Sequence, residues 1–229
     1  MPLLTAPGSN LLLEIQTEDF LKCVTSYGGN YPPSELDCRV LIDYVFLDSQ
    51  EKERMINRPQ RLMIECVQDA EGVSYKELIS DSGDVRIPTD SITIDLSEVN
   101  YPVKSLVWVA YSTSDLARKN YFQYTDIIQS ASLKFNGVER TSIELAGYFE
   151  KIQTYYHATR CIPDNVFMYN FALDASSHQP CGHCTFGEIR KPTLEVTLKE
   201  KRDDIVVKVF ILGYRFLEFY HGRVRILFI

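Results

Sequence analysis

Short stretches in which apolar and polar residues strictly alternate run through this sequence, and they constrain its fold more than any other feature. The clearest of them lie at residues 92–96, 131–135 and 193–199. A period of two places all the apolar side chains on one face of an extended chain, which is typical of a half-buried β-strand. Asn136-Gly137 follows the second stretch directly, and this dipeptide is a strong signal for a tight hairpin turn. The pattern therefore predicts a protein built mainly from β-strands.

Eight principal strands are predicted from Cys38 onward, with long loops at 68–89 and 112–127. The strands lie at residues 40–46, 61–67, 92–96, 103–111, 131–135, 166–173, 193–199 and 205–219, with 224–229 as a terminal extension. Eight antiparallel strands without a helical partner must bury their apolar faces against one another, as in a two-sheet sandwich or a barrel. The jelly roll is one such sandwich, and the pattern alone leaves other sandwiches and barrels open.

One short helix is predicted after the first of these strands. Asp48 is suited to cap its first turn, and Glu51 three residues later completes a pattern similar to a capping box. The helix is expected to end by Arg58, because Pro59 disfavours a helical conformation at the residue before it.

Length, composition and charge exclude several classes of protein. With 229 residues, of which 45% are hydrophobic and 12% aromatic, the chain can bury a sizeable core as a single domain. Its 24 basic and 31 acidic residues give a net charge of −7, which argues against direct binding to nucleic acid. No apolar run is long enough to span a bilayer, and no secretory signal is expected. The six cysteines are scattered, so free thiols in a reducing compartment are expected.

Five short motifs follow one another in a fixed order between residues 133 and 180. They are Leu133-Lys134-Phe135-Asn136-Gly137, Gly147-Tyr148-Phe149, Tyr155-Tyr156-His157, Tyr169-Asn170-Phe171-Ala172-Leu173 and His178-Gln179-Pro180. Each motif is weak alone, but their order and spacing together resemble the signature block of the major capsid proteins of nucleocytoplasmic large DNA viruses. The resemblance implies an all-β fold, an eight-stranded antiparallel jelly-roll β-sandwich with long loops between strands and one or two short helices.

The resemblance extends over residues 38–229. Segments 40–54, 61–65 and 101–109 look like successive parts of the second of the two jelly rolls that members of this family carry in one chain. Residues 11–17 resemble the last strand of the preceding jelly roll. The resemblance therefore predicts an N-terminal arm and linker at 1–37, followed by a C-terminal jelly-roll capsid domain at 38–229.

The same resemblance implies a structural virion protein and not an enzyme. Family members form homotrimers that serve as pseudo-hexagonal capsomers of an icosahedral shell, with neighbouring capsomers and minor capsid proteins as partners. For this chain it implies a place in the virion capsid after assembly in the host cell cytoplasm. No cofactor is expected, and the charge and hydropathy described above predict no direct contact with nucleic acid and no transmembrane segment. Two alternatives stay open. One is a single jelly-roll minor capsid or scaffold protein, and the other is a jelly-roll module that binds glycans or a receptor.

Cys181 and Cys184 form the sharpest candidate for site chemistry, a C-x-x-C pattern close to His183 and His178. Two thiolates and two imidazoles suit a tetrahedral zinc ion, and Cys161 also lies nearby in the sequence. A single C-x-x-C without a second pair at zinc-finger spacing is a weak signal for zinc, and the family resemblance implies a tight turn here. A structural turn is therefore preferred over a metal site, with His178 bonded to the backbone of the turn. No catalytic or cofactor-binding residue is predicted.

Several aromatic residues are candidates for contacts with other proteins, since aromatic side chains are enriched in the cores of interfaces. They are Trp108, Tyr155, Tyr156, Phe219 and Tyr220. For Trp108 a place in the ordinary sandwich core is preferred. The loops at 68–89 and 112–127 are also expected to carry interfaces, because loops carry recognition while a sandwich holds them still.

Overall fold

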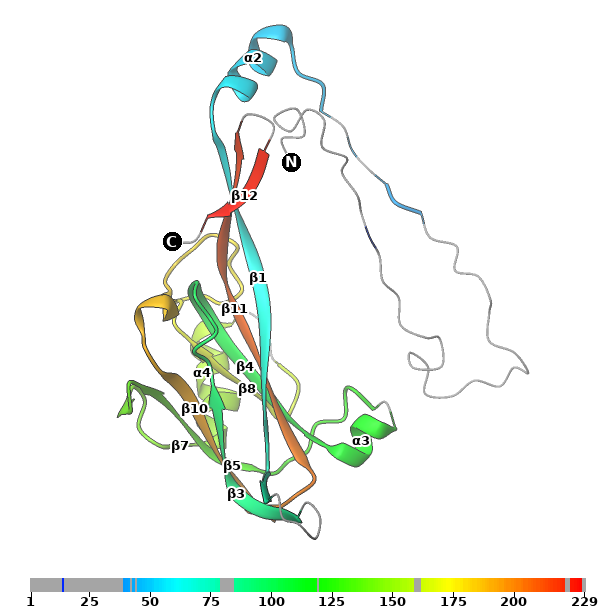
Figure 1. Ribbon diagram of the computed structural model, residues 1–229, viewed down its shortest axis with the longest axis vertical. Helices are drawn as coiled ribbons and strands as arrows, with labels where there is room; N and C mark the ends of the chain where they lie inside the picture. Colours follow the sequence, from blue (N-terminus) through cyan, green and yellow to red (C-terminus); the bar gives the residue numbers. More distant parts are fainter. Residues whose placement is uncertain are drawn as a thin grey trace, which may run out of the picture. The chain divides into compact units, whose positions relative to one another are not determined.

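The computed structural model (Figure 1) divides into two compact units, Met1–Met63 with Phe216–Leu227, and Ile64–Arg215 with Phe228–Ile229. The residues that it describes are 14, 39–41, 43, 45–78, 85–118, 120–158, 162–220 and 223–227. The predicted strand at 11–17 therefore lies outside the described residues, apart from Glu14. Among the described residues, no helix combines the length and the apolar character needed to cross a membrane.

Two sheets of six strands each make up the fold. The first has the order β1 (Gln60–Val73), β11 (Ile205–Tyr220), β4 (Pro102–Ser112) and β8 (Val166–Asn170), with β12 (Arg223–Leu227) beside β11 and β9 (Cys184–Thr185) beside β4. The second has the order β2 (Tyr75–Leu78), β3 (Val85–Asp95), β10 (Pro192–Arg202), β5 (Ile128–Phe135) and β6 (Val138–Glu139), with β7 (Glu144–Leu145) beside β5.

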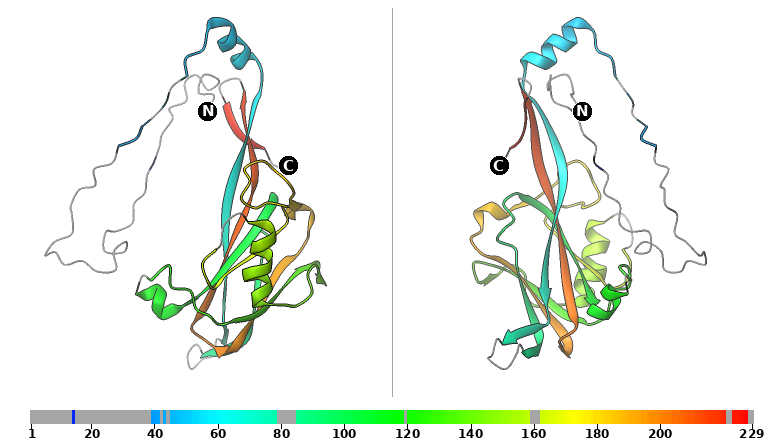
Figure 2. Two further views of the ribbon diagram at one scale, coloured as in Figure 1. Left: turned by 180° about the vertical axis from the view of Figure 1, so that it is seen from behind. Right: turned by 45° about the vertical axis from the view of Figure 1, so that its right-hand side comes forward.

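The strands pair in a nested order. The pairs are β1 with β11, β3 with β10, β4 with β8 and β5 with β6, so the earliest strand of the set is the partner of the latest. The outermost pair, β1 and β11, can be followed side by side in all three views (Figures 1 and 2). A long hairpin folded over on itself into two sheets is the jelly roll. The predicted fold class, an eight-stranded jelly-roll sandwich, is confirmed.

The core lies between the two sheets of the second unit. Alternate residues of each strand enter it, as the sequence pattern predicts: Ile92 and Ile94 from β3, and Leu106 and Trp108 from β4, are all no more than 2% exposed. Trp108 is completely buried, and its ring lies 5.0 Å from that of Phe149 and 6.2 Å from that of Phe167. The predicted core position of this tryptophan is confirmed.

The hairpin turn at Asn136-Gly137 is confirmed. It joins β5 to β6, and both residues have positive φ angles, 55° and 81°. Two consecutive residues in the left-handed region are characteristic of the type I′ turn, which asparagine and glycine tolerate best.

The helix predicted after Asp48 is also confirmed. It is α2 (Ser49–Asn57), and the Asp48 carboxylate accepts a hydrogen bond from the backbone N–H of Glu51 at 2.8 Å. Arg58 already has extended backbone angles, as the proline after it requires.

Four further short helices lie in the second unit. They are α3 (Thr113–Ala117), η2 (Tyr148–Ile152), α4 (Gln153–His157) and η3 (Phe186–Glu188). Of these, η2 and α4 cover the free edge of β8. The Gln153 side chain accepts a hydrogen bond from the backbone N–H of Asn170, and the Glu150 carboxylate accepts one from that of Asn165. An edge strand protected in this way offers fewer groups for unwanted pairing.

The strand predicted at 40–46 is not observed. Residues 39–41, 43 and 45–48 belong to no helix or strand, and Leu41 and Phe46 are more than 90% exposed. Alternation alone does not make a strand, because the backbone also needs a neighbour with which to exchange hydrogen bonds. The place beside β11 is taken by β1, which begins only at Gln60.

The prediction of a long loop at 68–89 is also wrong. Residues 68–73 continue β1, and β2 and β3 pair as a hairpin after it. The stretch is polar because every second side chain of β1 lies on the solvent-facing side of its antiparallel sheet, so polarity here does not exclude a strand. The loop predicted at 112–127 is largely confirmed and contains the short helix α3.

Candidate functional site: the 171–183 loop

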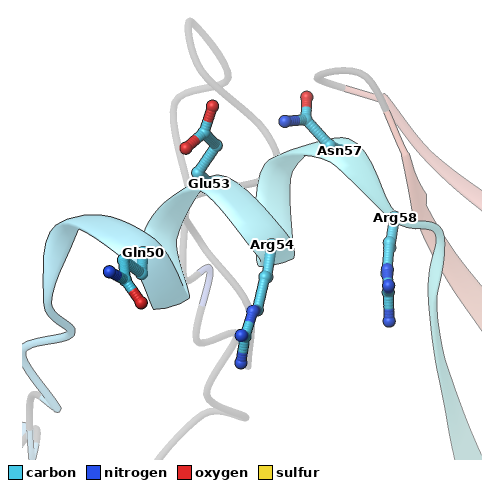
Figure 3. Close-up of a pocket in the computed structure, with 5 residues that line it drawn as sticks. All are labelled: Gln50, Glu53, Arg54, Asn57 and Arg58. Carbon is cyan, nitrogen blue, oxygen red and sulfur yellow. The ribbon is translucent and has the colours of Figure 1, made fainter.

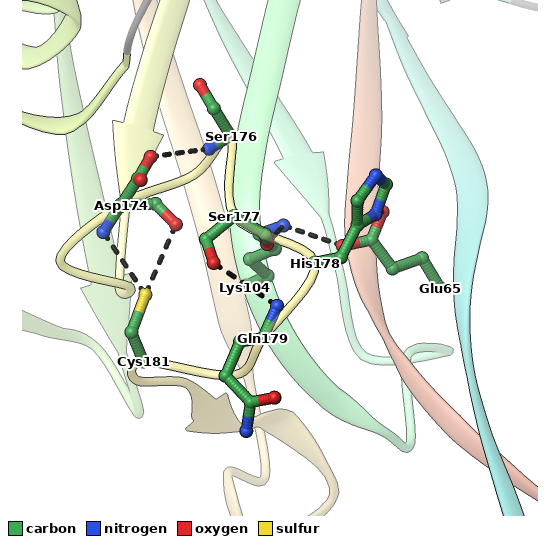
Figure 4. Close-up of polar contacts among 8 residues, drawn as sticks. All are labelled: Glu65, Lys104, Asp174, Ser176, Ser177, His178, Gln179 and Cys181. Atoms are coloured by element: carbon green, nitrogen blue, oxygen red, sulfur yellow. Dashed lines mark hydrogen bonds and ion pairs between the residues drawn. The ribbon is translucent and has the colours of Figure 1, made fainter.

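Two of the signature motifs, Tyr169-Asn170-Phe171-Ala172-Leu173 and His178-Gln179-Pro180, fall at the start and in the middle of the loop at residues 171–183, between β8 and β9 (Figure 4). Both ends of this loop lie on β4: Asn170 at its start is paired with Ser105, and Cys184 at its end is paired with Val103. Lys104 therefore stands between the two ends of the loop. The backbone oxygen of Lys104 accepts hydrogen bonds from the N–H groups of Phe171 at 3.0 Å and Ala172 at 3.2 Å.

A β-bulge explains why Lys104 is available for this role. Along β11, Leu212 is paired with Ser105 and Gly213 with Val103, so Lys104 is the extra residue of β4 at this point. The extra residue of a bulge has no ladder partner on the neighbouring strand, and its side chain is aimed away from the regular alternation.

The Lys104 side chain is only 3% exposed. Its ammonium group lies 2.7 Å from Glu65 Oε1 of β1 and 2.7 Å from the backbone oxygen of Ser177 in the loop. The ammonium group also lies over the face of the Tyr214 ring, with Lys104 Nζ 5.7 Å from the ring centre. A buried ammonium group is costly unless it is paired and hydrogen-bonded, and these contacts meet that need. Lys104 thus joins β1, β4 and the middle of the loop.

Within the loop, Cys181 is bonded to the backbone of Asp174. Its thiol donates to the Asp174 carbonyl oxygen and accepts from the Asp174 N–H, with both sulfur distances at 3.2 Å. The Cys181 carbonyl oxygen accepts from the N–H of Leu173. The two sides of the loop are therefore joined to each other as well as to the sheet.

Gly182 occupies a position that only glycine fits. Its φ angle is 143°, and a Cβ atom there would lie 2.8 Å from the carbonyl oxygen of Phe171. The sequence Cys181-Gly182 thus has a conformational role that does not depend on a metal ion.

The zinc candidates are spread over different surroundings. His178 is 96% exposed, and its Nδ1 lies 3.9 Å from Glu65 Oε2, instead of bonding to the backbone of the turn as predicted. His183 is exposed, and burial raises the pKa of the Cys184 thiol in β9. Within the part of the chain that the structure describes, no three His, Cys, Asp or Glu side chains gather as metal ligands would. Cys161 lies outside that part, so the preference for a structural turn stays a prediction.

The candidate interface aromatics divide into two groups. Phe219 is buried, as Trp108 is, whereas Tyr155 and Tyr156 of α4 are 82% and 70% exposed, with ring centres 5.3 Å apart. Tyr220 is 39% exposed. The exposed pair on α4 is therefore the strongest of the predicted contact residues.

A second ionic cluster lies in the first unit, and sequence reasoning missed it. Glu218 of β11 is 3% exposed, and its carboxylate binds Arg225 of β12 and, at 3.0 Å, the Nε of Arg61 in β1. Hydrogen bonds from Arg225 and Arg61 hold the pKa of the Glu218 carboxyl below its usual value. In the sequence, a buried charge of this kind is indicated by a single charged residue among apolar ones. Glu218 stands in FLEFY at 216–220, and Lys104 stands in VKSLVWV at 103–109. A charge in such a setting needs a partner.

A shallow depression beside α2 is lined by Gln50, Glu53, Arg54, Asn57 and Arg58. Arg54 and Arg58 project to the same side of the chain, away from Glu53 and Asn57 (Figure 3). All five residues come from one short stretch around a single helix, so no opposing wall encloses a ligand.

Comparison with known proteins places this architecture in a family. The family described as the large eukaryotic DNA virus major capsid protein matches residues 51–213. The chain is 26% identical over 205 residues to the major capsid protein of Paramecium bursaria Chlorella virus 1, covering 76% of this chain and 45% of that protein. It is 29% identical over 213 residues to the major capsid protein of Pyramimonas orientalis virus, covering 82% of this chain and 48% of that protein. The chain thus spans about half the length of these curated relatives.

Among solved structures, a chain from a quasi-atomic model of the PBCV-1 virus capsid is similar, with a TM-score of 0.61 and 22% identity. The similarity covers 81% of this chain and 55% of that chain. It supports the fold, and the family match extends over most of the strands that form it. This chain belongs to the family of major capsid proteins of large eukaryotic DNA viruses.

Proposed function

We propose that this chain is a structural virion protein, a major capsid protein or its C-terminal half, that builds the shell of a large DNA virus. The observation that carries the proposal is the nested eight-strand sandwich of Gln60 to Tyr220, which overlaps the segment 51–213 that matches the family. A sandwich of this kind supplies rigid faces and fixed loops. The mechanism is assembly, in which many modest interfaces add through symmetry. No residue performs catalysis.

The proposed partners are two further copies in a homotrimer, and then neighbouring capsomers and minor capsid proteins in an icosahedral shell. The exposed pair Tyr155 and Tyr156 supports such contacts, because large aromatic side chains left in water tend to mark interaction sites. The proposed location is the virion capsid, after assembly in the cytoplasm of the host cell.

Sedimentation velocity of the purified full chain over a range of concentrations tests the assembly proposal. We expect the population of trimers to grow with concentration, and the double variant Tyr155→Ser/Tyr156→Ser to associate about tenfold more weakly, as expected when an aromatic anchor is lost. Lys151→Ser is the matched control, since Lys151 is exposed on the adjoining helix η2 but offers no aromatic surface. A chain that stays monomeric at every concentration would contradict the assembly of this chain by itself.

We further propose that residues 38–229 are the C-terminal jelly roll and 1–37 an arm and linker that follows another jelly roll. This proposal is supported by the comparison of lengths, because the chain spans about half the length of the curated relatives that it matches. The intact mass of the native polypeptide, measured from its source under denaturing conditions, tests this. A mass about twice 26.4 kDa fits the proposal, and a mass of 26.4 kDa contradicts it.

A further inference from the structure

Two loops of the second unit form a pocket that the assembly proposal does not use. The described parts of these loops are residues 120–127, between α3 and β5, and residues 162–165, between α4 and β8. The pocket has a volume of about 400 Å³ and is lined by Phe122, Gln123, Tyr124, Pro163, Asp164 and Asn165. The pocket is open to solvent, so a small molecule bound there would keep one side exposed.

A secondary hydrophobic cluster holds the first loop in place. Val109 and Tyr111 of β4 point away from the main core, and Tyr124 packs against them. The rings of Tyr111 and Tyr124 meet edge to face with their centres 5.6 Å apart. The backbone N–H of Thr125 donates to the Ala110 oxygen at 2.9 Å. The loop is therefore fixed to β4 directly beside the pocket.

The second loop is fixed on the same cluster. Ile162 packs against it together with Val166, the first residue of β8. Asn165 has a φ angle of 64°, and its N–H is bonded to the Glu150 carboxylate at 2.9 Å. The described residues of both walls are thus held by backbone hydrogen bonds and buried side chains.

The side chains at the pocket combine one apolar ring with three polar groups. Phe122 is 89% exposed. Gln123, Asp164 and Asn165 bring amide and carboxylate groups to the described lining. Asp164 is the one charged residue among the described lining, which does not suit an anionic ligand such as phosphate.

This combination matches the chemistry of a neutral saccharide. The C–H face of a sugar ring packs on an aromatic ring, while its hydroxyl groups both donate and accept hydrogen bonds. A carboxylate accepts from hydroxyls, and an amide can do both. We propose that the pocket between these loops binds a neutral saccharide, with Phe122 as the stacking surface and Asp164, Asn165 and Gln123 as hydrogen-bonding groups. This would add recognition of carbohydrate to a protein whose proposed role is assembly.

Saturation-transfer difference NMR on the full chain tests the proposal. The probes are methyl glycosides of glucose, mannose, galactose, fucose and N-acetylglucosamine, each at millimolar concentration. We expect signal from the ring protons of at least one probe. Its affinity should fall about tenfold in Phe122→Ala and in Asp164→Ala, as expected when a stacking or hydrogen-bonding partner is lost.

Tyr121→Ala is the control, because Tyr121 is 44% exposed next to Phe122 but does not line the pocket. Thermal unfolding shows whether each variant keeps the fold. Lack of signal from every probe overturns the proposal. Equal sugar binding by Phe122→Ala and the wild type also overturns it, because the sugar then lies elsewhere. Loss of self-association in Phe122→Ala without any sugar signal overturns it too, in favour of a protein contact.

Discussion

Lys104 is the only charged residue of β4, and it joins this strand to both β1 and the 171–183 loop. Its backbone oxygen holds the start of the loop, and its ammonium group holds the middle of the loop to Glu65. The bulge in β4 frees the residue for both tasks. At the scale of single residues, the loop therefore depends on one lysine placed where the regular ladder is interrupted.

Replacing this lysine should destabilise the protein far more than replacing a surface lysine. We expect Lys104→Met to lower the free energy of unfolding by roughly 2 kcal/mol, because the Ser177 carbonyl and the part-buried Glu65 carboxylate lose their partner. Limited proteolysis should also cut the 171–183 loop faster. Urea unfolding measures the first effect.

Lys199→Met is the control for this experiment, since Lys199 is 46% exposed and paired with Asp126 at the surface. It should cost less than about 1 kcal/mol. Equal losses in the two variants would mean that burial of Lys104 has no energetic consequence. A double-mutant cycle with Glu65→Gln isolates the contact itself.

Alanine substitutions at three glycines distinguish backbone strain from steric clash. Gly182→Ala should cost about 2–3 kcal/mol, because it combines a positive φ with a close approach to backbone. Gly137→Ala should cost about 1 kcal/mol, since φ is positive but the space is open. Gly147→Ala should cost about zero, because φ is −61° and nothing lies within 4 Å. Thermal or urea unfolding ranks the three, and any other order contradicts this account.

At the scale of secondary-structure elements, the end of β11 is the junction of the first unit. Arg61 of β1 and Arg225 of β12 reach the one buried carboxylate of Glu218 from two different strands. The carboxylate therefore connects three strands, and the ionisation of one residue controls that connection.

Protonation of Glu218 at low pH should weaken its ion pairs with Arg61 and Arg225. The pKa of Glu218 is lowered in the folded protein, so the stabilising contribution is present above the unfolded-state pKa of about 4.3 and is lost as pH falls through the folded-state value. We expect Glu218→Gln to have a lower urea midpoint than the wild type at pH 7. The gap should narrow progressively as the pH falls below the unfolded-state pKa and through the lowered folded-state pKa.

Glu77→Gln is the comparison, because Glu77 and Arg86 form an exposed pair at 3.8 Å, with side chains 54% and 56% exposed. Its midpoint should differ little from the wild type at either pH. A gap for Glu218→Gln that stays constant with pH would show that the effect comes from packing instead of charge.

Elements with local signals were the ones that sequence could predict. Asp48 and Pro59 mark both ends of α2, and Asn136-Gly137 marks its hairpin, because each acts through the backbone of its immediate neighbours. The prediction of a strand at 40–46 was wrong because a strand forms only beside a partner strand, and that partner is distant in the sequence. Lys104 and Glu218 were missed because the value of a buried charge depends on which strand lies beside it, and the sequence pattern does not contain that information.

At the scale of the whole molecule, the nested pairing makes both sheets depend on non-local strand pairs such as β1–β11, β3–β10 and β4–β11, beside local hairpins such as β2–β3 and β5–β6. The core cannot close until strands far apart in the sequence meet, and such topologies fold slowly. Trp108 is the only tryptophan and lies completely buried against Phe149 and Phe167, so its fluorescence reports on closure of the sandwich.

We expect this tryptophan signal to recover during refolding with a time constant of roughly 0.01–10 s, as is typical of β-sandwiches. Stopped-flow dilution from urea measures it. The variant Phe149→Leu should lower the stability while the slow phase remains, because topology and not one contact sets the barrier. Recovery of the native signal within microseconds would contradict the link between nested pairing and slow closure.

The pairing of β1 with β11 also has a consequence for synthesis in the cell. The ribosome completes β1 at Val73 and does not finish its partner until Tyr220, so at about 5–20 residues per second roughly 7–30 s separate the two. Throughout that interval each nascent chain carries an unpaired β1, which can meet the same strand of another nascent chain. The same strand that later lies beside β11 is, for those seconds, a template on which neighbouring nascent chains can aggregate, so productive yield depends on how well chaperones shield it.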